Sequence, residues 1–393
     1  MHTHRVLLRT ALSLAHVFAW IFLFEYFFVI TGTAESVATS AARALAAVVL
    51  LYGFAQFITI VATPMSAAHL KRGTRHSLIS GVLCAATAFV FLGGSLSGYF
   101  SASPLWGVVA FAVFFGLYRA LYWVPYKVSQ VEIPPHMHMR AYFEVLIALM
   151  PLFAGLAIGT IVFAQERLLF GAAALLVIAI IPLLFLSDTR ERFSWSYVYT
   201  FEQLFRSKNH GLVLQSMLEG VQGAALFLMW PLAVFLILEW SYLALGLVFT
   251  LTLLFVVLLR RAYRWMMQSS RLADSPSIYT VLAVSAWIAR LSAGTPVGVI
   301  VANVYAFTTD SERGTHFDPA SFEHVSDRGA FLDEYTALKE IALAVGRIML
   351  CAIVFFIAPV FPVAVVLGIA LGIAALSSGI AVLVARREAA PVY

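Results

Sequence analysis

The segment Ser187–His210, SDTRERFSWSYVYTFEQLFRSKNH, is the longest polar break in the first two-thirds of this chain of 393 residues. Six long apolar segments precede it and six follow it. Within the break, Val198, Phe201 and Phe205 recur at helical spacing beside Arg206, a pattern typical of an amphipathic helix in a membrane interface. We therefore interpret the break as a linker between two bundles of apolar helices.

The apolar segments have the length and composition of membrane-spanning helices. A hydrocarbon core of ~30 Å is crossed by about 20 helical residues, and a helix satisfies its backbone hydrogen bonds internally, as lipid requires. The whole composition agrees, since 62% hydrophobic and 11% charged residues leave too little polar surface for a soluble globule. The twelve segments lie near residues 11–30, 44–62, 77–97, 105–124, 141–164, 168–187, 211–237, 242–259, 277–292, 294–310, 337–358 and 361–385.

Two of these segments, 277–292 and 294–310, are short and nearly continuous. As one helix they would be roughly 50 Å long at ~1.5 Å per residue, which is too long for a single crossing. A single helix would also move the basic residues that follow it to the opposite side of the membrane. We therefore expect a helical hairpin in this region.

The basic residues sort to alternate connections between the apolar segments. Of the 25 Lys and Arg residues, 20 lie at the termini and on alternate loops, whereas only Arg43 and Arg167 lie on the other loops. The positive-inside rule then places both termini in the cytoplasm, with an even number of spans. The sequence predicts a multi-pass protein of the cytoplasmic (inner) membrane, whose basic residues meet anionic lipid of the bilayer and bind no nucleic acid.

The predicted fold class is all-α: a polytopic membrane protein with 12 transmembrane helices in two pseudo-symmetric six-helix bundles. The predicted boundaries are 1–187 for the N-terminal bundle, 188–210 for a cytoplasmic linker with an interfacial helix, and 211–393 for the C-terminal bundle. We expect the first apolar run to be a span rather than a cleaved signal, because it continues to Ile30 without a small-residue cleavage pattern.

A weak internal repeat supports the symmetry of the two bundles. The stretch FEVLIA at Phe143–Ala148 aligns with KEIALA at Lys339–Ala344, which places Glu144 and Glu340 at the same inner end of equivalent helices. Parallel repeats of six spans are one way in which secondary transporters are built, with the substrate path along the axis between the halves.

In its predicted topology the chain resembles the major facilitator superfamily over essentially its whole length. The family's inner loop after the second span, roughly G-x-x-x-D-R-x-G-R-R, is matched by the basic residues and glycine of Lys71–Arg75, with Leu70 in the place of the acid. Arg119 in the fourth span matches the arginine of the family's R-x-x-x-G pattern, with Trp123 in the place of the glycine. The resemblance implies a secondary transporter that alternates access to a central cavity.

Ionisable side chains within the spans are the candidate functional residues, because each costs about 2.5–3.5 kcal/mol at a helix centre. Counted at ~1.5 Å per residue from the inner ends, Arg119, Glu219 and Arg347 lie in the inner half of the bilayer. Glu144 lies nearer the inner surface, and the four residues are expected to share one inner cavity. Glu25 lies farther out and has no basic residue at its depth, so burial favours its neutral form and makes it a candidate proton carrier. The predicted substrate and proton pathway comprises Glu25, Gln56, Arg119, Glu144, Glu219, Gln222, Asn303, Glu340 and Arg347.

Each of these residues also has a structural interpretation. An ion pair of Arg119 with Glu144 or Glu219 would serve as a clamp between helices, and Glu25 would serve as a polar group that faces water in the cavity. The uncharged neighbours expected for Glu25 along the path are Gln56, Gln222 and Asn303.

Other residues of the spans are expected to have packing roles. His16 is more typical of a packed or cavity-lining histidine than of a catalytic one. Arg290, near the outer end of its segment, is expected to extend to the interface. Gly220 and Gly223 are expected to allow close approach of a neighbouring helix.

The sequence predicts a secondary active transporter of a small molecule, coupled to protons, that acts as a monomer. The alternative is a non-transporting receptor or assembly partner on the same scaffold, with the acidic loop 310–336 as its docking surface. The sequence has no phosphate loop, nucleophile elbow or HExxH motif, so we expect no enzyme activity and no cofactor. We expect no metal site either, because His136 and His138 lack further ligands at useful spacing.

Overall fold

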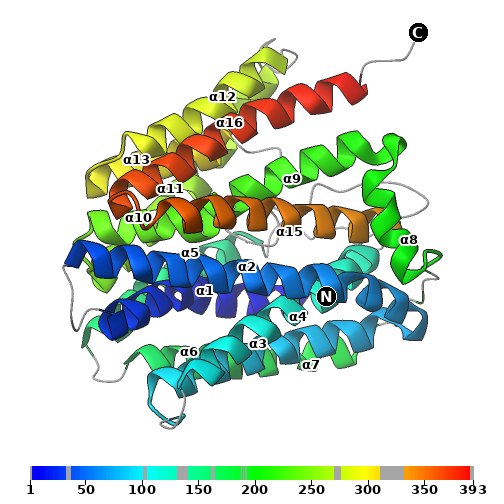
Figure 1. Ribbon diagram of the computed structural model, residues 1–393, viewed down its shortest axis with the longest axis horizontal. Coiled ribbons are helices and arrows are strands. Elements are labelled where there is room, and N and C mark those ends of the chain that lie inside the picture. Colours follow the sequence, from blue (N-terminus) through cyan, green and yellow to red (C-terminus); the bar gives the residue numbers. More distant parts are fainter. Residues whose placement is uncertain are drawn as a thin grey trace.

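The computed structural model describes residues 2–31, 37–100, 104–130, 140–160, 164–186, 188, 190, 193–269, 276–309 and 332–389. This part of the chain is almost entirely helical and contains no strand (Figure 1). His136, His138 and most of the acidic loop 310–336 lie outside the described residues.

The helices follow one another much as the hydropathy pattern predicts. The first half contains α1 (His2–Thr31), α2 (Val37–His69), the 3₁₀ turn η1 (Leu70–Arg72), α3 (Thr74–Leu96), α4 (Pro104–Gln130), α5 (Arg140–Thr160), α6 (Ala164–Ile178) and α7 (Ile181–Leu184). The linker contains α8 (Tyr197–Glu202), η2 (Gln203–Phe205) and η3 (Ser207–Asn209). The second half contains α9 (His210–Ala224), η4 (Ala225–Met229), α10 (Trp230–Ile237), α11 (Tyr242–Ser269), α12 (Pro276–Leu291), α13 (Pro296–Thr309), α15 (Leu332–Ile357) and α16 (Val363–Ala389).

Ten helices of the described chain are long and apolar enough to cross a membrane. The shorter apolar helices α12 and α13 occupy the place of the expected hairpin, and the chain leaves the helical path between them. Each begins with a proline, whose missing N–H has no acceptor in a first helical turn anyway. The chain is therefore an all-α polytopic membrane protein, as predicted. Its division into domains at residues 187 and 210 stays a prediction.

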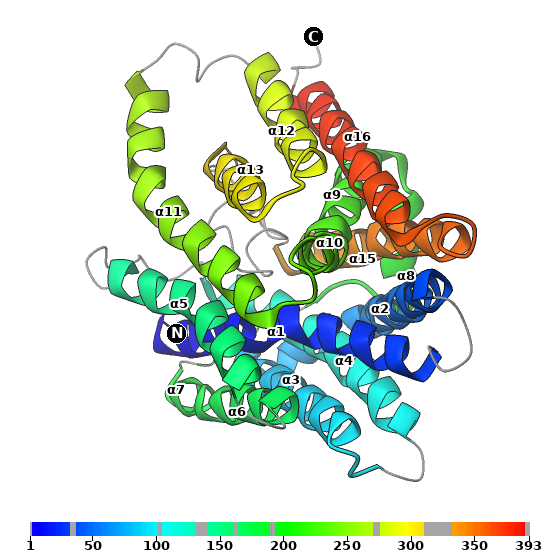
Figure 2. The same cartoon turned by 90° about the vertical axis from the view of Figure 1, so that its left-hand side faces the viewer.

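Two pairs of packed helices join the first half of the chain to the second half. Figure 2 shows α3, α4, α6 and α7 on one side of the molecule and α12, α13 and α16 on the opposite side. Between them, α2 packs along α15 and α5 packs along α11. We call the end of the molecule that carries α8 and the turn after α2 the linker end, and the end that carries the turn between α10 and α11 the far end (Figure 1).

Glycines bring helices into backbone contact both between the halves, where α5 meets α11, and within the second half, where α9 meets α15. A Cβ on Gly155 of α5 would collide with the backbone oxygen of Tyr242 on α11, and a Cβ on Gly246 would collide with that of Pro151. Gly220 of α9 lies equally close to the backbone of α15. The close approach predicted at Gly220 is thereby confirmed.

The helix after the linker runs through α9, η4 and α10 and widens at η4 into a turn of π-helix. Pro231 explains the widening, because its ring lacks an N–H and excludes the carbonyl of Phe227 from the usual helical position. Wide turns of this kind are frequent at functional sites. Here the turn faces α1 at the centre of the molecule, beside the pocket described below.

The linker is helical where the sequence predicts it. Ser196 caps α8, since its Oγ accepts a hydrogen bond from the backbone N–H of Tyr199 at 3.2 Å. Val198 and Phe205 are 65% and 81% exposed. Such exposed apolar side chains suit a helix lying in a membrane interface, and this placement stays a prediction.

Candidate functional site

A pocket with about 460 Å³ of empty volume, part of it open to solvent, lies between α1 and the second half of the chain. Its walls are mostly apolar and aromatic, and they come from helices of both halves. The lining residues are Leu12, Ser13, His16, Val17, Leu226, Phe227, Trp230, Pro231, Phe249 and Phe307. We call this the central pocket.

His16 is the titratable group of the pocket wall. It is 4% exposed, and its ring packs between Phe115 of α4 and Phe227 of η4, at centroid distances of 5.3 and 6.3 Å. Its Nδ1 has no hydrogen-bond partner in the described part of the protein, and such a buried polar atom is costly unless something binds it. Arg119 lies one helical turn beyond Phe115 on α4, is 3% exposed, and is within electrostatic range of His16. The sequence left open whether His16 packs or lines a cavity, and the structure places it on the cavity wall.

Asn303 and Arg290 contact Trp230 and Phe307, two aromatic residues of the pocket wall, and hold them in position. The indole N–H of Trp230 donates to Asn303 Oδ1 at 2.8 Å, and Arg290 Nε donates to the same oxygen at 3.4 Å. The Arg290 guanidinium lies over the rings of Trp287 and Phe307, at 4.7 and 5.2 Å. Arg290 is therefore buried, and the expectation that it extends to the interface is wrong. The reason is that α12 and α13 offer it two ring faces and an amide oxygen, which are good partners for a guanidinium.

Glu25 joins the two halves at the far end. Its Oε2 accepts a hydrogen bond from Gln165 Nε2 on α6 at 2.7 Å and another from the Tyr242 hydroxyl on α11 at 2.5 Å. The Tyr242 ring packs against Phe22 and Phe235, at centroid distances of 5.6 and 4.9 Å. We call Glu25, Gln165 and Tyr242 the latch. The uncharged neighbours predicted for Glu25 make their hydrogen bonds elsewhere.

One of those predicted neighbours, Gln56, lies on a seam between the halves. Arg347 Nη1 on α15 donates to Gln56 Oε1 on α2 at 2.9 Å, and both side chains are fully buried. Another, Gln222, is buried on α9 and donates to the carbonyl of Leu218 in its own helix at 3.3 Å. The sequence thus located two buried polar groups of the predicted pathway without identifying their partners.

Glu219 forms an ion pair with Lys339, which was expected among the basic residues of the inner loops. Its Oε2 lies 3.4 Å from Lys339 Nζ on α15, and its Oε1 accepts a hydrogen bond from Gln215 at 3.0 Å. Lys339 stands on the helix, within electrostatic range of Lys127 on α4. The ion pair joins α9 to α15 within the second half of the chain, which makes it a clamp rather than a wall of the central pocket.

Glu340 and Glu144, the remaining residues of the predicted pathway, lie on different helices, α15 and α5. Glu340 is fully buried on α15 and lies within electrostatic range of Lys127. Glu144 is half-buried on α5. A shared inner cavity of Arg119, Glu144, Glu219 and Arg347 stays a prediction, as does an ion pair of Arg119 with either acid.

The chain matches known proteins in its fold but not in its sequence. No protein-family model matches the chain, and no curated protein matches it. Solved structures of transporters do match it. The xylose transporter XylE from E. coli has a TM-score of 0.63 at 11% identity, covering 98% of this chain and 96% of that chain. A bacterial homologue of the iron transporter ferroportin has a TM-score of 0.61 at 13% identity, covering 98% and 97%. FucP, a major facilitator superfamily transporter, has a TM-score of 0.56 at 13% identity, covering 99% of both chains.

This chain has the major facilitator fold. At these identities the likeness shows the fold alone, and it confirms the resemblance seen in the sequence at that level. The matched structures are of transporters, not of enzymes.

Against the motif of the major facilitator superfamily, the loop after α2 differs in an informative way. Leu70, at the position of the family's acid, is fully buried in a small apolar cluster with Ala67, Val124 of α4 and Ala337 of α15. An acid does reach this loop from elsewhere: Asp188 Oδ1 accepts a hydrogen bond from the backbone N–H of Arg75 at 3.1 Å. In this chain an apolar contact therefore joins the halves at the position of the family's acid.

Proposed function

We propose that the protein is a secondary transporter that carries a small organic molecule across the cytoplasmic membrane by alternating access. The central pocket is its substrate site, and the linker end faces the cytoplasm. The observation that carries this proposal is the pocket itself, which is lined by α1 from one half and by η4, α10, α11 and α13 from the other. A site between two halves is the arrangement that rocking motions expose to one side at a time.

Contacts between the halves lie on both sides of the pocket, as alternating access requires. The latch closes the far end through the hydrogen bond that Tyr242 of the second half donates to Glu25 of the first half, while Gln165 binds the same oxygen from within the first half. At the linker end, the apolar cluster of Ala67, Leu70 and Val124 from the first half includes Ala337 from the second. Opening either end must break its own contacts while the other set holds, so that the two sets define two gates.

The pocket wall indicates the class of substrate. Ligand sites for organic molecules are mostly apolar with a few polar groups, and the lining of the central pocket has this character. His16 offers a polar atom to the ligand, and Arg119 adds positive charge behind it. We therefore propose an aromatic or otherwise apolar molecule that carries one acidic or hydrogen-bonding group.

The chemistry of the latch supports the proposal of proton coupling. An ionised carboxylate accepts hydrogen bonds at both oxygens, whereas a protonated one loses part of this capacity. Protonation of Glu25 removes the negative charge of its carboxylate, so the hydrogen bonds that Gln165 and Tyr242 donate to Oε2 lose their charge assistance and the closed far end weakens. Substrate affinity and proton affinity are then linked, and the linkage acts in both directions.

The test has a binding step and a transport step. Purified protein is screened by thermal shift against aromatic carboxylates and their matching amides and amines, since binding to the native state raises its stability. A stabilising compound is then followed in proteoliposomes with an imposed pH gradient. We expect Glu25→Gln to retain binding but to abolish uphill transport. Glu239→Gln is the matched control, because Glu239 is an exposed acid at the same end and should behave as wild type.

The outcomes distinguish the parts of the proposal. Uphill transport by Glu25→Gln at the wild-type rate would exclude Glu25 as the carrier and make Glu219 the next residue to test. Binding without any transport, in wild type as well, would favour the receptor alternative. Stabilisation by amines alone would contradict the role proposed for His16.

A further inference from the structure

A second hollow lies on the outside of the first half, away from the central pocket. Helices α2 and α3 both pack against α4, which forms the floor between them. The packing is close, because a Cβ on Gly116 of α4 would collide with α2, and a Cβ on Gly81 of α3 would press against α4. The groove above this floor has about 1130 Å³ of empty volume, part of it open to solvent.

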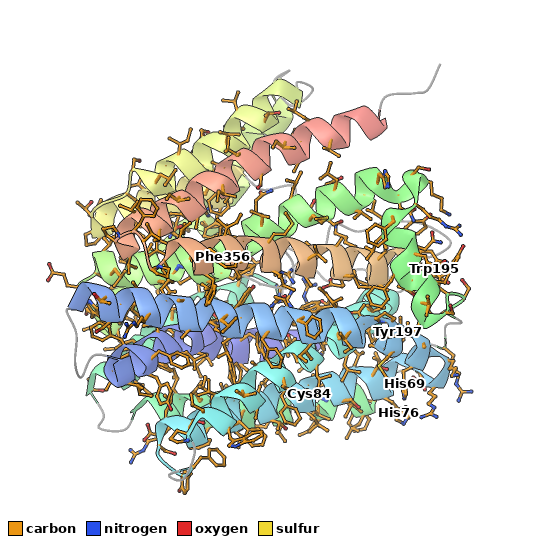
Figure 3. The ribbon with its side chains drawn as sticks, viewed as in Figure 1. His69, His76, Cys84, Trp195, Tyr197 and Phe356 are labelled. Atoms are coloured by element: carbon orange, nitrogen blue, oxygen red, sulfur yellow. The ribbon has the colours of Figure 1, made fainter. Side chains whose placement is uncertain are left out.

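The groove is basic at the linker end and apolar farther along. His69, Arg72 and His76 line it at the linker end and are exposed, and Arg72 Nη1 donates to His69 Nε2 at 3.3 Å. Figure 3 shows His69 and His76 close together at this end. Met65 of α2 and Leu117 of α4 line the apolar part.

The apolar part of the groove continues a surface that meets lipid. On α2, the exposed residues Phe57, Val61 and Met65 follow at intervals of four positions, and the next member of the stripe is His69. In a membrane-spanning helix, an exposed apolar stripe faces hydrocarbon. The change from Met65 to His69 therefore lies where the hydrocarbon gives way to headgroups.

One polar group inside the groove lacks a partner. Ser66 lines the groove and is 1% exposed, yet its Oγ has no hydrogen-bond partner in the described chain. Buried hydroxyls are normally hydrogen-bonded. A ligand oxygen seated between the basic residues and the apolar wall would satisfy it.

We propose that this groove binds an anionic phospholipid of the cytoplasmic leaflet. The phosphate lies among His69, Arg72 and His76, and an acyl chain runs along Met65 and Leu117. Positive charge at this leaflet attracts anionic lipid, and the apolar wall selects a lipid over a soluble phosphate, which would leave that wall unused. This inference rests on the proposed orientation of the linker end, and it is independent of transport.

The test is lipid binding to the purified full-length protein, measured by native mass spectrometry in detergent. Phosphatidylglycerol is compared with phosphatidylcholine of the same acyl chains and with glycerol 3-phosphate, which lacks them. We expect phosphatidylglycerol to bind at least about tenfold more tightly than either. Arg72→Gln should weaken that binding about tenfold, as expected for a lost hydrogen bond to a charged group. Lys71→Gln, an exposed cation on the same 3₁₀ turn that does not line the groove, should change it less than twofold.

Two further variants keep the test decisive. Ser66→Ala should weaken phosphatidylglycerol binding without removing charge, and Leu117→Trp, which fills the apolar wall, should weaken the binding of both phospholipids. Equal losses for Arg72→Gln and Lys71→Gln would reduce the effect to general surface charge and overturn the proposal. Glycerol 3-phosphate binding as tightly as the lipid would replace the lipid site by a phosphate site.

Discussion

Removal of one hydroxyl from the latch tests whether it holds the far end closed. Tyr242→Phe keeps the ring packed against Phe22 and Phe235 but deletes the O–H that donates to Glu25. A hydrogen bond to a charged group contributes about 1.5–3 kcal/mol. Because Glu25 is half-buried, solvent screening places the loss near the lower limit, ~1.5 kcal/mol. The population open at the far end should then rise about tenfold.

The assay measures access to the central pocket from the far side. Val17, a pocket residue, is replaced by cysteine in a protein that lacks Cys84 and Cys351, and labelling by an impermeant maleimide is followed in oriented proteoliposomes. Tyr242→Phe should raise the labelling rate about tenfold at neutral pH, by the hydrogen-bond loss just given. Lowering the pH should raise the rate of the otherwise unchanged reporter protein, because protonated Glu25 is a poorer acceptor.

The control is Tyr26→Phe, the same chemical change at the residue next to Glu25. The Tyr26 hydroxyl makes no hydrogen bond in the part of the chain that the structure describes, so its removal should leave labelling unchanged. Equal rates for Tyr242→Phe and the unchanged reporter would refute the latch. An equal rise in Tyr26→Phe would show that lost ring polarity, and not the hydrogen bond, opens the far end.

Three other predictions concern stability and orientation. Glu219→Leu should lower the free energy of unfolding by about 3 kcal/mol, because it removes the partner of the mostly buried Lys339 ammonium; adding Lys339→Met should recover part of the loss, and strictly additive losses in a double-mutant cycle would contradict the pair. Gly346→Ala should lower the thermal midpoint because its Cβ would collide with the backbone of α9, whereas Gly368→Ala, with open space at its Cβ, should not; equal midpoints would argue against tight α9–α15 packing. A cysteine at Ser207 should react only from the cytoplasmic side, and labelling from outside would reverse the proposed orientation.

The sequence predicted the helices well because hydropathy and charge are local properties. The break between α12 and α13 followed from the length limit of a single span. Partner choice was less predictable, since it depends on how each helix is rotated about its axis. Arg290 shows the difficulty: its position near a segment end favoured the interface, while the structure turns it toward Trp287 and Asn303.

In the candidate site, too, the sequence did not indicate which side chains would be partners. The sequence identified Glu25 as an acid within a span, but its donors, Gln165 and Tyr242, are 140 and 217 positions away along the chain. Lys339 was counted among the basic residues of the inner loops although it lies within the segment 337–358, so its pairing with Glu219 was missed. For His16 the sequence allowed a packed or a cavity-lining position, and no pattern in it decided between the two.

The apolar contact of Leu70 gives the two gates different sensitivities. The cluster that holds Leu70 and Ala337 is apolar, so it is stabilised by dispersion and water exclusion, which respond weakly to salt and proton concentration and strengthen on moderate warming. The latch depends on one carboxylate and therefore on acidity. Cooling should thus ease separation at the Leu70 contact, whereas acid should ease separation at the latch. Temperature and pH then become two experimental controls by which each gate of the same molecule can be favoured separately.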